Sequence, residues 1–112
     1  MPACIFCAIG AGSIPATVVL ETPTTMGFRD VNPKSEVHVL VIPKEHFANA
    51  GEVAAARPEL IAEMMTTATR IAELEDVADT GYRVIFNTGT GGGQTVFHAH
   101  LHLLAGPRLP GF

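Results

Sequence analysis

Runs of β-branched and apolar residues separated by turn residues predict short strands in the first third of the chain. Two such runs lie at 17–21 and 25–29, with a turn at 22–24 between them. A third run covers 37–42 and ends at Pro43, and His38 is its only polar member. An unbroken apolar run of this length is typical of a central strand that is buried on both faces.

The middle of the chain has helical periodicity instead. Between residues 57 and 79 the apolar side chains recur at steps of three and four, and Pro58 suits a first helical position. After this helix, residues 82–87 and 96–104 read as strands, with a glycine-rich loop at 88–93. The pattern predicts one α+β domain over residues 1–112, with a five-stranded antiparallel sheet, one long helix and a short N-terminal helix.

Composition excludes several classes of protein. The 112 residues are 47% apolar and 16% charged, which is typical of a globular chain, and the net charge of −4 without any run of Lys or Arg argues against nucleic acid as a partner. The first twenty residues carry no charge, but they lack a basic segment and contain Pro2, Gly10, Gly12 and Pro15. We therefore expect neither a signal peptide nor a membrane span, and a cytoplasmic protein.

The most informative segment is 98–104, in which three of the five histidines alternate with apolar residues. In a strand these imidazoles would share one face, about 6.7 Å apart, while Ala99, Leu101 and Leu103 would face the core. One alternative explanation of the three histidines is a solvated strand face or an adventitious metal site. A cupin-type metal site is excluded because no Asp or Glu follows Asp79. A neutral imidazole can instead attack phosphorus, and a neighbouring imidazole can protonate the leaving group.

The glycine-rich loop directly before the histidines could bind an anion. Its glycines let backbone N–H groups approach a phosphate, and Asn87, Gln94 and Thr95 add neutral donors. It lacks the Lys of a Walker A motif and runs into a strand. By itself such a loop could be a simple turn, but here loop and imidazoles converge at one strand end.

The chain resembles the histidine-triad family of nucleotide-binding hydrolases, whose signature alternates three histidines with apolar residues, as in 98–104. Further landmarks at 4–7, 14–16, 28–33, 38–46 and 81–83 occur in the family's order, and Gly92-Gly93-Gln94-Thr95 looks more like the Hint branch of purine nucleoside phosphoramidases than the Fhit branch. Two departures stand out. The Hint branch commonly has Ser at the place of Thr95 and a Trp near the C-terminus, whereas this chain has no Trp.

The resemblance implies roles for particular residues. His100 would be the nucleophile, His102 would contact the phosphate or leaving group, and His38 would support them, unless His38 is merely a buried core residue. Asp30 would accept hydrogen bonds from ribose, although an Asp at this place can also cap a turn. The catalytic set would then be His38, Thr95, His100 and His102. The nucleotide-binding set would also include Ile5, Phe6, Ile9, Ile14, Phe28, Asp30, Val31, Leu40, Asn87, Gly93 and Gln94.

The implied activity is hydrolysis of purine nucleoside 5′-phosphoramidates, such as AMP-lysine, to the nucleoside monophosphate and an amine through a covalent nucleotidyl-histidine. The alternatives are a diadenosine polyphosphate hydrolase and a nucleotide-binding interaction module without turnover. The resemblance also implies a homodimer. Catalysis itself would need no cofactor.

Cys4 and Cys7 form a Cys-x2-Cys pair, which in a reducing compartment is more often a metal or redox motif than a structural disulfide. Zinc-bearing members of the family pair such cysteines with two histidines, which here are His46 and His98. The resemblance therefore implies a structural Cys₂His₂ zinc site. The alternative is two reduced thiols on the N-terminal helix, with His98 free to orient its neighbours.

Overall fold

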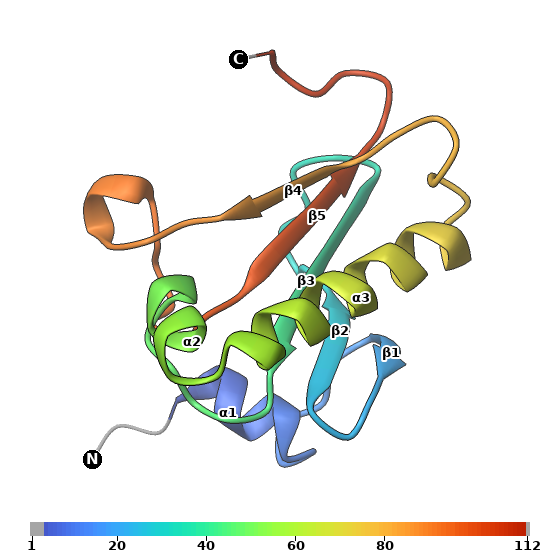
Figure 1. The fold of residues 1–112 in the computed structure, drawn as a ribbon. Coiled ribbons are helices and arrows are strands. Elements are labelled where there is room, and N and C mark those ends of the chain that lie inside the picture. The colour runs from blue at the N-terminus through green and yellow to red at the C-terminus, as the bar shows by residue number, and fades with distance from the viewer. Residues whose placement is uncertain (1–3, 112) are drawn as a thin grey trace.

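The computed structural model describes residues 4–111 and has the predicted α+β architecture. Its five strands form one antiparallel sheet in the order β1-β2-β3-β5-β4 (Figure 1). The strands are β1 (Val18–Glu21), β2 (Thr25–Arg29), β3 (Val37–Pro43), β4 (Arg83–Phe86) and β5 (Leu101–Ala105). Three strands precede the long helix and two follow it, as expected.

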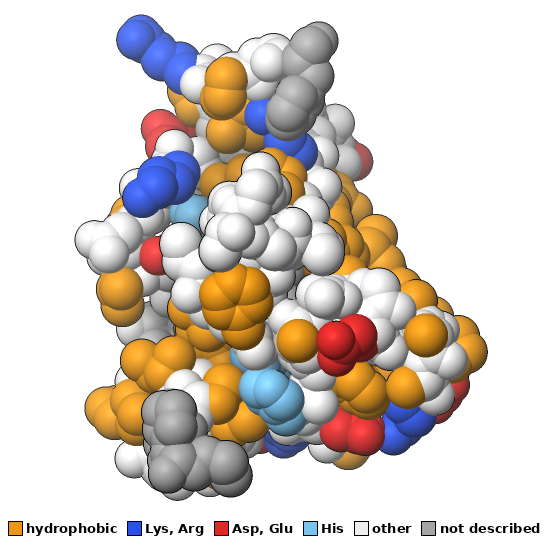
Figure 2. Space-filling view, turned by 90° about the vertical axis from the view of Figure 1, so that its left-hand side faces the viewer, with side chains coloured by type: hydrophobic (Ala, Val, Ile, Leu, Met, Phe, Trp, Pro, Cys, Tyr) orange, Lys and Arg blue, Asp and Glu red, His pale blue; other side chains and the backbone are white. Residues whose placement is uncertain are grey.

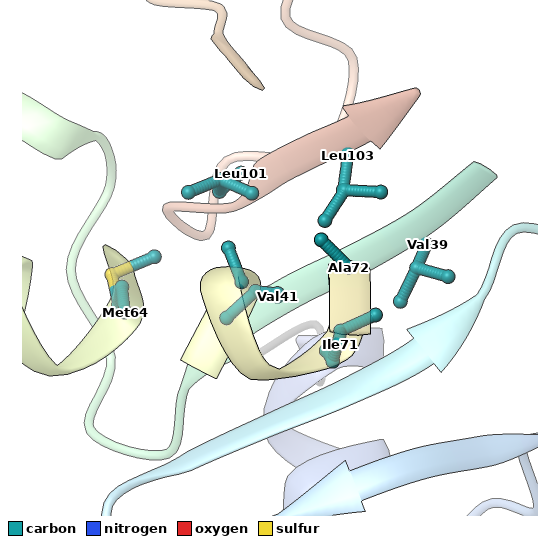
Figure 3. Close-up of a cluster of buried hydrophobic side chains, with 8 residues drawn as sticks. Val39, Val41, Met64, Ile71, Ala72, Leu101 and Leu103 are labelled. Atoms are coloured by element: carbon teal, nitrogen blue, oxygen red, sulfur yellow. The ribbon is translucent and has the colours of Figure 1, made fainter. Parts of the chain in front are cut away.

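The long helix α3 (Pro58–Leu74) lies across one face of the sheet, and the short helix α1 (Ile5–Gly10) packs on the other (Figure 1). Side-chain alternation divides β3 between them. Val39 and Val41 join Met64, Ile71 and the other residues of the α3 core (Figure 3). The intervening Leu40 and Ile42 pack against Phe6 and Ile9 of α1. The apolar run at 37–42 therefore is a central strand that is buried on both faces.

Helix α3 ends before the segment with helical periodicity, 57–79, does. Its last residue is Leu74, and Asp76 has a positive φ of 59°. The N–H groups of Asp76 and Val77 bond back to the carbonyls of Glu73 and Ala72, which is the hydrogen-bond pattern of a Schellman motif. This left-handed residue turns the chain away before Asp79.

The structure adds a helix that the sequence analysis did not predict, α2 (Ala50–Ala56). Asn49 caps it by accepting a bond from the N–H of Glu52, and Glu52 reaches back to the N–H of Ala48. The arrangement is close to a capping box, except that Glu52 bonds the residue before the cap; Asn with Glu three residues later was the available sequence signal. The helix was missed because it is short, contains Gly51 and buries only Val53.

The last strand begins later than predicted, at Leu101 instead of Val96. On one side the pairing with β3 stops at Val41 opposite Leu101, and on the other side β4 stops at Phe86, also opposite Leu101. Although β3 itself continues to Pro43, residues 96–100 form no ladder with it. Among the described residues, no helix is long and apolar enough to cross a membrane.

Candidate active site

The sequence pattern predicted that the three triad histidines share one face of a strand, but the structure places them otherwise. Only His102 belongs to β5, and His98 and His100 lie in the irregular segment before it. The alternation itself holds, because Ala99, Leu101 and Leu103 are buried in the core. The imidazoles of His100 and His102 lie 4.9 Å apart between ring centres. His98 instead contacts the cysteines.

The backbone fixes the proton position on His100. Its Nδ1 lies 2.8 Å from the carbonyl oxygen of His98, and because a carbonyl can only accept, Nδ1 must carry the proton. The lone pair of Nε2 is thus free in the neutral ring. Phe6 packs edge-to-face on this imidazole with ring centres 5.1 Å apart, which restricts its orientation.

A second chain of hydrogen bonds fixes His102. The backbone N–H of Lys34 donates to Nδ1 of His38 at 3.0 Å, so His38 carries its proton on Nε2. That Nε2–H faces Nδ1 of His102 at 2.9 Å, and His102 in turn must carry its proton on Nε2. Burial, with His100 and His38 nearby, lowers the pKa of His102 to about 4, so the free protein holds this imidazole neutral at pH 7. His38 is buried, and burial also lowers its pKa.

This tautomer excludes a metal ion between Asp30, His38 and His102, although their ligand atoms lie within 4.8 Å of one another. A metal would need a bare Nε2 on His38. Because the N–H of Lys34 donates to Nδ1 of His38, the proton of this neutral imidazole lies on Nε2. Asp30 lies 3.5 Å from that nitrogen, and its other oxygen accepts the N–H of Asn32 in the kind of turn that its sequence position suggested.

His100 and His102 open into a cavity of about 660 Å³ between α1, β2 and β3. On the side of the molecule in Figure 2, histidine surface appears at two separate places, with mainly hydrophobic and other uncharged atoms between them. Most of the predicted nucleotide-binding residues line the cavity: Ile5, Phe6, Ile9, Phe28, Asp30, Val31, Leu40, Thr95, His100 and His102. Ile14, Asn87, Gly93 and Gln94 are absent from its lining. The structure adds lining residues to which the sequence had assigned no role: Pro15, Ala16, Thr17, Arg29, Asn32 and Val96. Four of them lie within the landmarks 14–16 and 28–33.

The glycine-rich loop contains a single 3-10 turn, η1 (Thr90–Gly92), between two glycines with positive φ. Gly89 has φ 72° and Gly93 has φ 89°, values that residues with a Cβ rarely adopt. Gln94, predicted as a phosphate donor, is buried and its side chain bonds to the protein itself.

Cys4, Cys7, His46 and His98 form a compact cluster whose four ligand atoms lie within 4.8 Å of one another. The two His98 Nδ1 to sulfur distances are 3.4 and 3.5 Å, Cys7 Sγ lies 3.3 Å from His46 Nδ1, and the two Nδ1 atoms are 3.1 Å apart. A tetrahedral zinc ion requires about 3.6 Å between sulfur and nitrogen ligands and about 3.3 Å between two nitrogens. Nε2 of His98 donates to the carbonyl of Pro43 at 2.8 Å, which leaves Nδ1 bare for a metal. The residues therefore fit a structural zinc ion.

Comparison with known proteins places the chain among relatives that match along most of its length. The HIT domain family matches residues 11–109. Protein HitA of Neisseria gonorrhoeae is 41% identical over 107 residues, covering 96% of this chain and 99% of HitA. The purine nucleoside phosphoramidase of Escherichia coli K12 is 39% identical over 105 residues, covering 94% and 88%. The crystal structure of a HIT family hydrolase from Legionella pneumophila superposes with a TM-score of 0.91 at 44% identity and covers 96% of both chains.

Proposed function

The chain belongs to the HIT domain family, and we propose that it is a nucleotide hydrolase that cleaves purine nucleoside 5′-phosphoramidates to the nucleoside monophosphate and an amine. The observation that carries the proposal is the pair of oriented imidazoles at the cavity. One presents a bare nitrogen and the other an N–H donor. The E. coli relative, named as a purine nucleoside phosphoramidase, supports the same substrate class.

In the first step the lone pair on Nε2 of His100 forms a bond to phosphorus. The phosphorus–nitrogen bond breaks, and its electron pair leaves with the amine. The substrate nitrogen takes up one proton from solvent, so the amine leaves neutral, while the Nε2–H of neutral His102 donates a hydrogen bond to the phosphoryl group. The anionic phosphoryl group favours protonation of the nitrogen that it carries. The product of this step is a nucleotidyl-His100 in which the carbonyl of His98 still accepts the Nδ1 proton.

In the second step water attacks the same phosphorus, the bond to His100 breaks with its electron pair returning to Nε2, and the water proton passes to solvent. The nucleoside monophosphate leaves and both imidazoles regain their starting forms. Asp30 and the apolar wall of Phe6, Phe28 and Leu40 are suited to hold the ribose and the base.

The charges around the cavity favour this substrate over dinucleoside polyphosphates. Arg29 is the cationic residue in the lining, and its guanidinium is held by both carboxylate oxygens of Glu75 at 2.8 Å. A polyphosphate tail carries several charges that call for Lys, Arg or a metal ion. Neutral donors and imidazoles suit a single phosphoryl group better.

The test compares wild type with His100→Asn and His102→Asn on an adenosine 5′-phosphoramidate and on diadenosine tetraphosphate. We expect the phosphoramidate to have the higher kcat/KM and His100→Asn to lose several orders of magnitude in turnover while still binding AMP. Mass spectrometry of the quenched wild-type reaction should find the adduct on His100. A preference for the tetraphosphate, an adduct on His102, or near-normal turnover in His100→Asn would contradict the proposal.

We also propose that Cys4, Cys7, His46 and His98 bind a structural zinc ion. The ion would have no open position for water and would tie α1 to the triad segment, because the ligands come from both. Protein purified without chelator should contain about one zinc per chain. Cys4→Ser should lower the melting temperature much more than the rate per folded molecule. Metal-free wild type with an unchanged melting temperature in Cys4→Ser would leave two ordinary thiols as the explanation.

The proposal includes a homodimer. Within the described residues β4 is an edge strand that pairs with β5 alone, and an open edge is a template for pairing with a second chain. Light scattering during gel filtration should give twice the chain mass of 11.8 kDa. A mass of one chain at micromolar concentration would contradict it.

A further inference from the structure

The side chain of Gln94 uses both of its donors inside the protein. Its Nε2 donates to the carbonyls of Ala48 at 2.7 Å and Val96 at 3.0 Å, and its Oε1 accepts the N–H of Gly89 at 2.9 Å. The residue is only 2% exposed. A carboxamide has two N–H donors, so none is left for a phosphate oxygen.

These bonds close the glycine-rich loop. The backbone N–H of Gln94 donates to the carbonyl of Gly89 at 3.0 Å, so backbone and side chain of one residue hold the same glycine from two directions. Four of the five residues 89–93 are glycines, which lose more conformational entropy on ordering than other residues. A loop of this composition keeps one shape only if such bonds hold it.

The bond to Ala48 connects the loop with two other parts of the site. In Figure 1 the loop (orange) lies beside α2 (green). Ala48 directly precedes Asn49, the N-cap residue of α2. The neighbouring Phe47 accepts the N–H of Ala99 at 2.7 Å, between His98 and His100. Gln94 therefore stands where the loop, the triad segment and the chain that carries His46 meet.

Thr95 and Val96 follow Gln94 directly and line the cavity. The bond from Gln94 to the carbonyl of Val96 fixes the turn that directs these two residues. We propose that Gln94 is a positioning residue that holds the glycine-rich loop and Thr95 against the triad, and that it does not bind phosphate itself. This inference rests on the proposed phosphoryl chemistry.

The experiment compares Gln94→Glu and Gln94→Met with wild type. Glu has the same length and keeps an acceptor for Gly89, but it places an oxygen against two carbonyl oxygens; Met keeps the length and loses all three bonds. We expect kcat for the adenosine phosphoramidate to fall at least about tenfold in both variants, because Thr95 is displaced from the cavity where charge develops. The Kd of AMP should stay within about threefold of wild type, because base and ribose contacts come from other elements.

Amide exchange of the ligand-free proteins gives a second readout. The Gly89 amide should lose protection in Gln94→Met and retain part of it in Gln94→Glu, where an acceptor remains. Asn49→Ala is the matched control. It removes the cap of α2 next to Ala48 without touching the bonds of Gln94, and should lower stability while leaving kcat unchanged.

The opposite pattern would overturn the proposal. If Gln94 donates to phosphate, the Kd of AMP rises with the loss of kcat and Gly89 protection is unchanged. A kcat equal to wild type in Gln94→Met would also refute it.

If neither variant folds, wild-type NMR decides. The two Nε2 protons of Gln94 should exchange slowly and keep their shifts when AMP binds, whereas a large shift would indicate a phosphate contact. Wild type without turnover on any test substrate would contradict the proposed function, whereas the free-protein amide data would still test the loop contact.

Discussion

Replacement of His38 tests the hydrogen-bond chain that sets the proton on His102. We compare His38→Leu, which removes the donor to His102, with His38→Gln, whose side-chain amide can reach the same nitrogen. His38 lies outside the cavity lining, so neither change alters the surface that contacts a nucleotide.

The magnitude follows from the bond that is lost. In residues 4–111 every fully buried side-chain nitrogen or oxygen has a hydrogen-bond partner. His38→Leu removes the 2.9 Å bond to Nδ1 of His102 and leaves a half-buried acceptor without a donor. Such a loss costs about 1–3 kcal/mol, and if it applies fully in the transition state, kcat falls by roughly 5- to 150-fold. The glutamine variant should recover part of this loss.

The assay has two parts. Long-range proton–nitrogen NMR of the imidazoles should find His102 as the Nε2–H tautomer in wild type and as a mixture of tautomers in His38→Leu. Steady-state turnover of the phosphoramidate should fall in the same order, from wild type through Gln to Leu. The reasoning is refuted if wild-type His102 carries its proton on Nδ1, or if His38→Leu retains the full rate.

Two further predictions concern stability. Because burial lowers the pKa of His102 to about 4 from the ordinary 6.5, the unfolded chain binds this proton at pH values where the native protein does not. The free energy of unfolding should therefore fall as the pH drops from 6.5 to 4, by up to about 3 kcal/mol. Urea titrations should show that this free energy depends less on pH in His102→Asn than in wild type. The same pH dependence in both proteins would contradict the lowered pKa of His102. In Gly27→Ala the new Cβ would lie 2.3 Å from Cδ1 of buried Ile71, which should cost about 1–3 kcal/mol. Ile71→Val removes that methyl, so the double variant should be more stable than the sum of the two single losses indicates, and strict additivity would show that the two side chains do not meet.

Much of the fold could be predicted because local pattern and tertiary environment agree. The apolar run at 37–42 became the central strand, and the helical period after Pro58 became α3. The predictions failed at boundaries that depend on neighbours. The last strand begins at Leu101 because its ladders to β3 and β4 both end there, and α3 ends at Leu74, before the left-handed Asp76.

For the site, the sequence predicted the type of chemistry, but it did not predict which groups orient each histidine. The spacing of the histidines indicated phosphoryl chemistry, and most residues implied by the family resemblance line one cavity. The backbone groups that orient them, the carbonyl of His98 and the amide of Lys34, left no trace in the sequence, because every residue except proline carries the same N–H and carbonyl.

The sequence by itself determined which chemical groups the protein has and which strands and helices its alternation allows. The tertiary structure alone decided that His98 contacts the cysteines, that His38 bonds to His102, and that the Gln94 amide donates to the carbonyls of Ala48 and Val96. Each of these contacts except that to Val96 joins residues more than forty positions apart. Local pattern extends over a few turns or a strand, so only packing of the sheet against α1 and α3 brings such groups within hydrogen-bond distance.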